Sequence, residues 1–572
     1  MSKTQSNAGN EPEVPDLLSS KGTYSVTSPP DVAYWGPPGT GKTTTLMEVL
    51  EEKLAEGYAP EQIGGFTYRK DMAAEFRNRA TEEAGGVADD HWFRTTHAAC
   101  YRLLDIRQED VVDGDALRQF CEANGYGWGS QHADAGDEDD SPWVSQNTSS
   151  SDPESGELLA AARSWCLNMG LNPRSEWRKS NVDLDARQQL SDVLVAEFND
   201  EYEAWKDAKG MYDFDDMLVE VLERNVSPPV DILIEDEFQD KTPLQVEVYN
   251  QWADHADEVY VGGDPYQSIY TYAGTHPQFM YQAFDSAERS VILDKSYRLG
   301  EGVVNYASDI LRNGGHTMPD IEPAGDTTVE RIGWEEYGNR IQKHDTDETF
   351  HLVRANFLTK NVAGLLSDHG VPFESATATW TSKQRNIYNG IARIRAAFDN
   401  AAALQQPEFD LSPSVASHVV DVLPSSVLLE SKGDTKEMVE DGQPLEPQVR
   451  VGDLATLVQG NPFSGIEKRD SSSLVPSAIG SQGVRNRLSG AWSGRDGEEI
   501  DEINHAISTI HGAKGQERDV VFLLDASTKT IREDADISHE AMVWYVGASR
   551  ASDQLYVVED VPGTTYEAEV LP

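Results

Sequence analysis

The sequence predicts an α/β fold built from parallel sheets flanked by helices. The first indication is an apolar strand at 32–35, followed by a glycine-rich turn and a helix at 43–54. A second strand at 65–68 completes this strand–turn–helix–strand pattern. Such alternation is typical of strands that run parallel and are joined by crossover helices.

The same alternation returns twice further along the chain, and it predicts a second unit of the same kind. Further apolar strands of the first unit are expected at 231–235, 258–261 and 290–293. The second unit begins near Glu301 and closes with strands at 520–524 and 555–558. We therefore expect two α/β domains with parallel sheets, each carrying an inserted subdomain.

Composition shifts define the expected boundaries. A helical insertion is expected at 105–199, with an acidic, serine-rich loop at 131–156, and a reduced, polar and proline-rich accessory insertion at 380–500. Composition also favours a disordered tail at the start of the chain. The resulting division is a tail at 1–22, a first domain at 23–104 and 200–300, and a second domain at 301–379 and 501–572.

The charge of the chain is strongly acidic. It has 572 residues, with 99 Asp and Glu against 47 Lys and Arg, which gives a formal net charge of -52. The acidic residues are spread along the whole length, a pattern that favours a surface adapted to molar salt, where the Debye length is only ~3 Å. We expect the high-salt cytoplasm of a halophile, or its virus or plasmid. The alternative is an acidic partner-binding protein in ordinary salt.

The cysteines and the apolar runs of the chain limit the kinds of site and partner to be expected. Cys100, Cys121 and Cys166 are far apart and form no CxxC pair, so neither a disulfide framework nor a cysteine metal site is expected. The polar N-terminus lacks the apolar region of a signal peptide, and no run approaches the ~20 apolar residues of a membrane helix. We expect a protein with no membrane partner.

Residues 36–43, GPPGTGKT, match the GxxxxGK[ST] pattern of a phosphate-binding loop between a strand and a helix. Backbone N–H groups of such a loop cradle phosphates, while Lys42 supplies charge and the Thr43 hydroxyl binds Mg²⁺. The alternative is a glycine-rich turn without a ligand. The predicted nucleotide contacts are Gly36, Pro37, Pro38, Gly39, Thr40, Gly41, Lys42, Thr43 and Thr44.

The strand at 231–235 runs into a carboxylate pair in the sequence DILIEDEFQD. Asp236, at the strand tip, is predicted to hold Mg²⁺, and Glu237 to polarise the attacking water. A charged turn is the alternative, because adjacent acids are common in so acidic a chain. Lys42 and Asp236 are 194 residues apart, so a subdomain must be inserted between them.

Further motifs follow in a fixed order. They are FTYRKDMA at 66–73, TH at 96–97, FDD at 214–216, DEFQD at 236–240, GDPYQSIY at 263–270, SYR at 296–298, RAN at 354–356, TIHGAKGQE at 509–517 and YVGASRA at 545–551. In this order the chain resembles the UvrD/Rep/PcrA-type superfamily 1 DNA helicases. The resemblance implies two RecA-like motor domains that use ATP and Mg²⁺.

The resemblance also implies roles for individual residues at the nucleotide. Gln267 would sense the γ-phosphate, and Arg298 and Arg550 would be arginine fingers contributed by two domains. Gly515 and Glu517 would contact the nucleotide, with Glu517 at the ribose. Structural ion pairs for the arginines and a surface carboxylate for Glu517 are the alternatives.

A DNA track is implied as well. Its residues would be Thr67, Tyr68, Thr96, His97, Tyr270, Tyr272, Arg354, Asn356, Thr509 and His511. Base stacking, here on Tyr272, resists molar salt better than phosphate contacts that depend on counterion release. For Tyr68, His97 and Tyr272 the alternative is a place in the core.

The chain departs from the family pattern in two places: Gln5 is the only glutamine before the phosphate-binding loop, and Ala273 replaces an arginine. We expect an ATP-dependent enzyme that moves 3′ to 5′ on single-stranded DNA, or from a single-strand/duplex junction, and separates strands as a monomer or weak dimer. The alternatives are a translocase that displaces proteins without efficient unwinding and a nucleotide-switched DNA-binding protein. The sequence indicates no protein partner.

Overall fold

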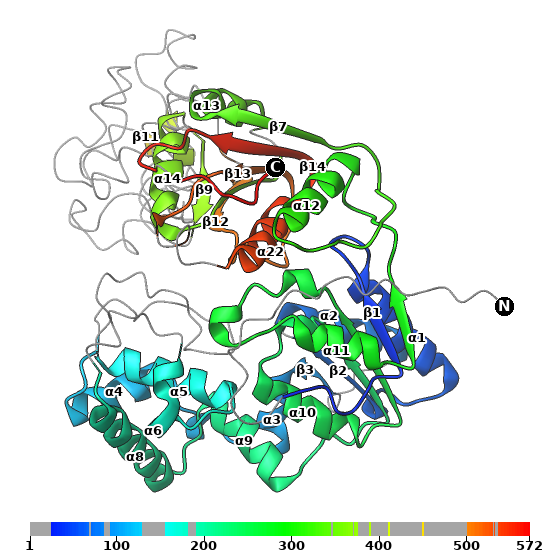
Figure 1. The fold of residues 1–572 in the computed structure, drawn as a ribbon, viewed down its shortest axis with the longest axis vertical. Coiled ribbons are helices and arrows are strands. Elements are labelled where there is room, and N and C mark those ends of the chain that lie inside the picture. Colours follow the sequence, from blue (N-terminus) through cyan, green and yellow to red (C-terminus); the bar gives the residue numbers. More distant parts are fainter. Residues whose placement is uncertain are drawn as a thin grey trace. The chain divides into compact units, whose positions relative to one another are not determined.

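The computed structural model divides into two compact units (Figure 1). The first comprises residues 1–304, 308–325 and 538–545, and the second comprises 305–307, 326–537 and 546–572. The structure describes residues 24–67, 70–84, 92–128, 155–180, 190–344, 347–369, 371–375, 388–389, 410–411, 449–450, 500, 502–529, 531, 536–564 and 566–572. The predicted tail at 1–22 and nearly all of the predicted serine-rich loop at 131–156 lie outside these residues.

The first unit contains a six-stranded sheet in which every pair is parallel, in the order β3-β2-β4-β5-β1-β6. The strands are β1 (Val32–Trp35), β2 (Ile63–Thr67), β3 (Trp92–Thr95), β4 (Ile232–Glu235), β5 (Glu258–Gly263) and β6 (Arg289–Ile292). The interior strands β2 and β4 are buried along their whole length, as expected for a parallel sheet covered on both faces.

Helices cover both faces of this sheet. They are α1 (Lys42–Glu56), α2 (Lys70–Ala84), α3 (Thr96–Leu103), α9 (Phe214–Arg224), α10 (Pro243–Ala253) and α11 (Gln278–Ser286). Successive residues of β4 pack into different cores: Ile232 and Ile234 join the cluster that contains Leu46 of α1, whereas Leu233 joins the cluster that contains Trp252 of α10. The alternation of side chains along a strand therefore explains the three-layer arrangement.

The helical insertion has a core of its own. It consists of α4 (Gly114–Asn124), α5 (Ser155–Asn168), α6 (Pro173–Glu176) and α8 (Asp192–Lys209). Phe120, Trp177 and Phe198 are among the fully buried side chains of this core.

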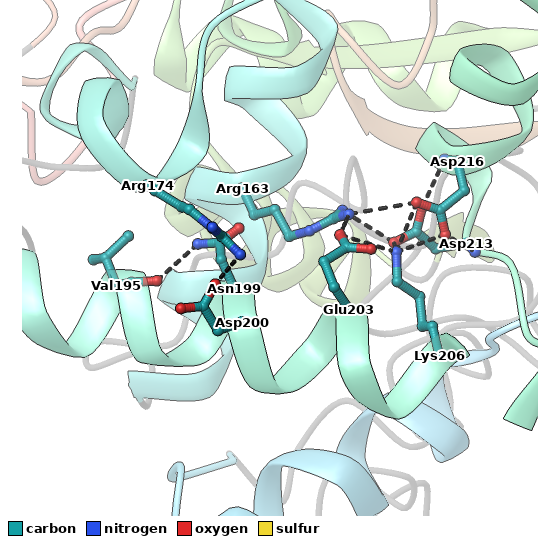
Figure 2. Close-up of polar contacts among 9 residues, drawn as sticks. All are labelled: Arg163, Arg174, Val195, Asn199, Asp200, Glu203, Lys206, Asp213 and Asp216. Carbon is teal, nitrogen blue, oxygen red and sulfur yellow. Dashed lines mark hydrogen bonds and ion pairs between the residues drawn. The ribbon is translucent and has the colours of Figure 1, made fainter. Parts of the chain in front are cut away.

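A buried ion cluster joins the insertion to the start of α9 (Figure 2). Arg163 Nη1 of α5 lies 3.0 Å from Asp213 Oδ2, and Lys206 Nζ of α8 lies 3.1 Å from the same oxygen. Lys206 Nζ also lies 2.6 Å from Asp216 Oδ2. Since Asp213 and Asp216 form the capping box of α9, the same carboxylates start the helix and hold the insertion.

The second unit contains another six-stranded parallel sheet, in the order β7-β14-β13-β8-β12-β9. Its strands are β7 (Thr328–Gly333), β8 (Thr349–Val353), β9 (Phe373–Ser375), β12 (His505–Thr509), β13 (Arg518–Leu524) and β14 (Ala551–Glu559). Helices α13 (Trp334–Ile341) and α14 (Thr359–Asp368) belong to this unit, while α12 (Glu301–Asn313) and α22 (Ile537–Ala548) have residues in both units. The predicted α/β class with two parallel sheets is confirmed.

The predicted accessory insertion at 380–500 lies almost entirely outside the described residues. Its described parts include a short antiparallel pair, β10 (Asp410–Leu411) with β11 (Val449–Arg450). Within the described part of the chain, no helix is long and apolar enough to cross a membrane.

Candidate active site

The phosphate-binding loop connects β1, an interior strand, to α1. Gly41 caps the helix in the left-handed conformation, with φ 77°, so the chain turns sharply into α1 at Lys42. Gly39 also has a positive φ, and a Cβ added there would lie 2.7 Å from Cβ of Arg298. Only glycine fits such a close approach at this backbone conformation. The N-terminus of α1, a helix of 15 residues, provides the N–H groups and dipole that bind an anion.

The first two residues of α1, Lys42 and Thr43, link the phosphate-binding loop to Asp236, which follows β4. Lys42 is buried and lies against Gly36, since a Cβ added to Gly36 would be 2.2 Å from Cγ of Lys42. The Thr43 hydroxyl donates to Asp236 Oδ2 at 2.7 Å. A hydroxyl and a carboxylate in direct contact are oxygen ligands of the kind that Mg²⁺ takes, so these residues fit the implied ion.

The loop that follows β4, residues 236–240, carries the carboxylate pair and is called the acidic loop below. Asp236 is buried, and burial together with the charge of Glu237 raises the pKa of Asp236 to about 7, while its hydrogen bond from Thr43 and the charge of Lys42 oppose the rise. Glu237 has a left-handed backbone, with φ 53°, and its N–H donates to Asp236 Oδ1 at 2.8 Å. Left-handed backbone at a non-glycine residue costs on the order of 1 kcal/mol and is frequent at functional sites.

Gln239 joins this loop to the motif that follows β5. Its side-chain Nε2 donates to Glu237, and its Oε1 accepts from the Asp264 N–H at 2.9 Å. Gly263 permits this contact, because a Cβ there would lie 2.7 Å from Gln239 Oε1. Gln267 Nε2 in turn donates to Asp264 Oδ2 at 3.0 Å. The structure therefore brings Glu237 and the predicted γ-phosphate sensor Gln267 into one hydrogen-bonded network.

No role was predicted for Gln239 or Asp264, although both belong to the motifs at 236–240 and 263–270. Each is fully buried, and Asp264 caps the 3-10 turn η6 (Pro265–Gln267) by accepting from the Tyr266 N–H. For Asp264 the available signal was its place directly after the apolar strand β5, a position at the ligand edge of a parallel sheet, whereas Gln239 lies four residues past the end of β4.

The SYR segment lies beside the phosphate-binding loop within the first unit. The Tyr297 N–H donates to the Gly39 carbonyl at 2.8 Å, and Arg298 contacts the same glycine. The Ser296 hydroxyl oxygen accepts from the N–H groups of Arg298 and Leu299 at 3.3 and 2.9 Å, which fixes the turn. Arg298 therefore lies beside the phosphate-binding loop, and its role as an arginine finger stays a prediction.

The other predicted nucleotide residues lie in the second unit. Arg550 is 2% exposed, and its guanidinium donates to the carbonyls of Val546 at 2.9 Å and Gln516 at 3.2 Å. Gly515 has a positive φ of 78°, and the neighbouring Glu517 is exposed. The roles of Arg550, Gly515 and Glu517 at the nucleotide stay predictions.

The predicted DNA residues of the first unit lie at strand ends and in turns. Thr67 ends β2 with its side chain buried, and Thr96 starts α3. His97 packs edge-on against Phe214, with ring centroids 5.7 Å apart. The rings of Tyr270 and Tyr272, beside the turn η7 (Thr271–Ala273), are also edge-to-face at 6.1 Å. Tyr68 lies outside the described residues.

The predicted DNA residues of the second unit gather at one edge of its sheet. Arg354 and Asn356 follow the end of β8, and Thr509 ends β12, with His511 two residues later. Because Val353 of β8 pairs with Thr509 of β12 in parallel register, all four residues lie at or just after the carboxyl ends of neighbouring strands.

The fold and this site define a P-loop nucleoside triphosphatase: a phosphate-binding loop follows β1, an acidic loop follows β4, and both lie at the carboxyl edge of one parallel sheet in which β5 separates the two strands. Comparison with known families refines this class. The model of the UvrD/REP helicase N-terminal domain matches residues 32–288, and that of the UvrD-like helicase C-terminal domain matches 493–560. The chain belongs to the UvrD/Rep/PcrA-type family of ATP-dependent DNA helicases.

The chain is similar to several DNA helicases of bacteria. ATP-dependent DNA helicase UvrD2 of Mycobacterium tuberculosis is 25% identical over 556 residues, covering 90% of this chain and 74% of the relative. ATP-dependent DNA helicase PcrA of Bacillus subtilis is 21% identical, covering 91% and 79%. DNA helicase II of Haemophilus influenzae is 23% identical, covering 62% and 51%.

Proposed function

We propose that this chain hydrolyses ATP with Mg²⁺ and uses the energy to move 3′ to 5′ along single-stranded DNA and to separate duplex strands. The observation that carries the proposal is the contact between Thr43 and Asp236, which joins the phosphate-binding loop to the acidic loop at 2.7 Å. The direction of movement and the preference for single strands rest on the family resemblance.

In this proposal the residues around that contact have separate roles in ATP hydrolysis. Lys42 neutralises charge on the β- and γ-phosphates, and Thr43 and Asp236 hold Mg²⁺, which supplies further positive charge when bound. Glu237 orients the attacking water and accepts its proton. The left-handed backbone of Glu237 and its contact with Gln239 support this role, because both restrict where the carboxylate lies.

Gln267, Arg298 and Arg550 would respond to the γ-phosphate. Positive charge delivered to that phosphate stabilises the transition state, and departure of the γ-phosphate after hydrolysis would release these contacts. The predicted DNA residues would then alternate between tight and weak binding of the strand. We further propose that the enzyme acts as a monomer or weak dimer.

The acidic composition supports a working environment of molar salt, in the cytoplasm of a halophile or in its virus or plasmid. At such salt, repulsion among carboxylates is screened, and DNA binding has to depend on stacking and short hydrogen bonds. We therefore place the test of activity at high potassium concentration.

The test is steady-state ATP hydrolysis in about 2–3 M KCl with Mg²⁺, with and without single-stranded DNA. We expect DNA to stimulate turnover strongly, and Glu237→Gln to lower it by at least about 100-fold while ATP binding persists, since the amide cannot accept the proton. Turnover that ignores DNA, or that survives in Glu237→Gln, contradicts the proposal.

Strand separation needs its own measurement. A forked duplex with a 3′ single-stranded arm should be opened in the presence of ATP, whereas a fork with a 5′ arm should not. ATP turnover without release of a strand from either fork would favour a translocase that displaces proteins. DNA binding that depends on nucleotide, without turnover, would favour a nucleotide-switched DNA-binding protein.

A further inference from the structure

A buried ion pair closes the acidic loop, and neither partner belongs to the predicted site. Glu235, the last residue of β4, is 1% exposed, and Lys241 is 6% exposed. Lys241 Nζ lies 2.9 Å from Glu235 Oε2. Because both side chains are withdrawn from water, removing one partner alone would leave the other as an uncompensated buried charge.

This pair bridges the two ends of the loop. Only residues 236–240 lie between the two partners, and these carry both carboxylates of the candidate site together with Gln239. Asp236 is bonded to Glu235 through one peptide unit and accepts from the Thr43 hydroxyl. The contact between Glu235 and Lys241 therefore connects the two ends of the loop that carries Asp236 and Glu237.

Lys241 has a second contact, on a different element. Its Nζ donates to Oγ1 of Thr96 at 3.4 Å. Thr96 begins α3, directly after β3, and its neighbour His97 is the other predicted DNA residue of this element. One buried ammonium therefore touches the acidic loop on one side and the start of a predicted DNA-binding helix on the other.

We propose that Lys241 is a positioning residue that transmits DNA binding at Thr96 and His97 to the acidic loop, and so contributes to stimulation of ATP hydrolysis by DNA. The inference rests on the proposed function. Movement of the start of α3 displaces the Thr96 hydroxyl, and Lys241 follows because its charge cannot leave Glu235 without stranding it. The rival explanation is an ion pair that only stabilises the fold.

The test is the double variant Glu235→Leu/Lys241→Met, measured as the ratio of turnover with saturating single-stranded DNA to turnover without it. Replacing both partners of a buried pair with apolar residues is often neutral or stabilising, so a purely structural pair leaves the ratio unchanged. We expect the ratio to fall at least tenfold, with the ATP concentration at half-saturation within about twofold of wild type.

A matched control is available in the same unit. Lys53 of α1 and Glu258, the first residue of β5, form an ion pair at 2.8 Å, and the Lys53 side chain is 8% exposed. Glu258 lies at the amino end of its strand, away from the edge that carries the candidate site. Lys53→Met/Glu258→Leu should keep the wild-type ratio.

Thr96→Val supplies an independent arm, because it removes the hydroxyl and keeps the shape of the side chain. At saturating DNA it should lower the ratio severalfold, and it should have little further effect in the Glu235→Leu/Lys241→Met background. If the double variant does not fold, full stimulation of Thr96→Val at saturating DNA overturns the proposal.

The outcomes separate this inference from the proposed function. If wild type is not stimulated by DNA, the proposed function fails and this inference fails with it. If wild type is stimulated and the folded double variant is stimulated equally, only the role of Lys241 is overturned. Loss of stimulation in the double variant and its retention in the Lys53/Glu258 control supports the proposal.

Discussion

The first unit buries two groups of carboxylates, and their surroundings differ. In the ion cluster, Asp213 meets the cations Arg163 and Lys206, whose charges lower its pKa although burial opposes this (Figure 2). In the acidic loop, burial and the charge of Glu237 raise the pKa of Asp236 to about 7. Burial of a carboxylate therefore does not by itself indicate a reaction site. A raised pKa does not separate the groups either, because burial and the charge of Asp213 also raise the pKa of Asp216 in the ion cluster to about 6. The distinguishing feature is the strained backbone of Glu237.

The largest expected effects come from replacing the lysine near each group of carboxylates, Lys42 beside the acidic loop and Lys206 in the ion cluster. Lys42→Met should reduce ATP turnover by at least about 100-fold, because charge developing on the phosphates loses its stabilisation. The midpoint of unfolding in denaturant should change little, since Lys42 contributes to a ligand site. A large loss of stability with turnover retained would reverse the assignment.

Lys206→Met should lower the stability of the fold and leave ATP turnover unchanged. It leaves Asp213 and Asp216 with one cation fewer in a buried setting, so the free energy of unfolding should fall by about 3–5 kcal/mol. Denaturant unfolding at fixed KCl concentration measures this loss. Turnover per folded molecule should equal that of wild type, and a specific loss of turnover would show that the ion cluster takes part in the reaction.

The smallest effect is expected at Asp215, which lies beside the ion cluster and accepts from Asn168 Nδ2 at 2.6 Å. Burial and the charge of Asp213 raise its pKa from 3.8 to about 7. The folded state therefore holds this proton more tightly than the unfolded state. The associated stability is present below pH 4, declines as the pH rises to about 7, and is absent above it.

Asp215→Asn should consequently raise the Tm by a few degrees at pH 8 and change it little at pH 4, because the amide carries no charge to desolvate. Thermal unfolding at the two pH values measures the difference. Asp207→Asn, at an exposed position of α8, is the control and should show no such pH dependence. An equal gain at both pH values would contradict the raised pKa.

Local patterns predicted much of the fold and part of the site. Continuous apolar runs predicted strands at 231–235 and 520–524, which the structure has at Ile232–Glu235 and Arg518–Leu524, and glycines predicted the loop before Lys42. These features depend on neighbours in sequence, which is why periodicity and motif spacing reveal them.

Contacts between distant residues were not predictable in the same way. Nothing in the sequence near Arg163 indicates that it meets Asp213, and nothing near Lys241 indicates that it reaches Thr96. Such pairs depend on how the insertion packs and on which strands become neighbours. A charged residue in a chain with 99 acidic side chains also gives no local sign of burial.

The position of β1 in its sheet has a consequence for synthesis of the chain. Val32 of β1 pairs with Tyr260 of β5 and Arg289 of β6. Both neighbours of β1 are therefore the last two strands of this sheet to be synthesised. At about 5–20 residues per second, β1 waits on the order of 10–50 s for a partner. The helical insertion, with its own core, emerges complete before β5, and its folding would precede closure of the sheet on the ribosome.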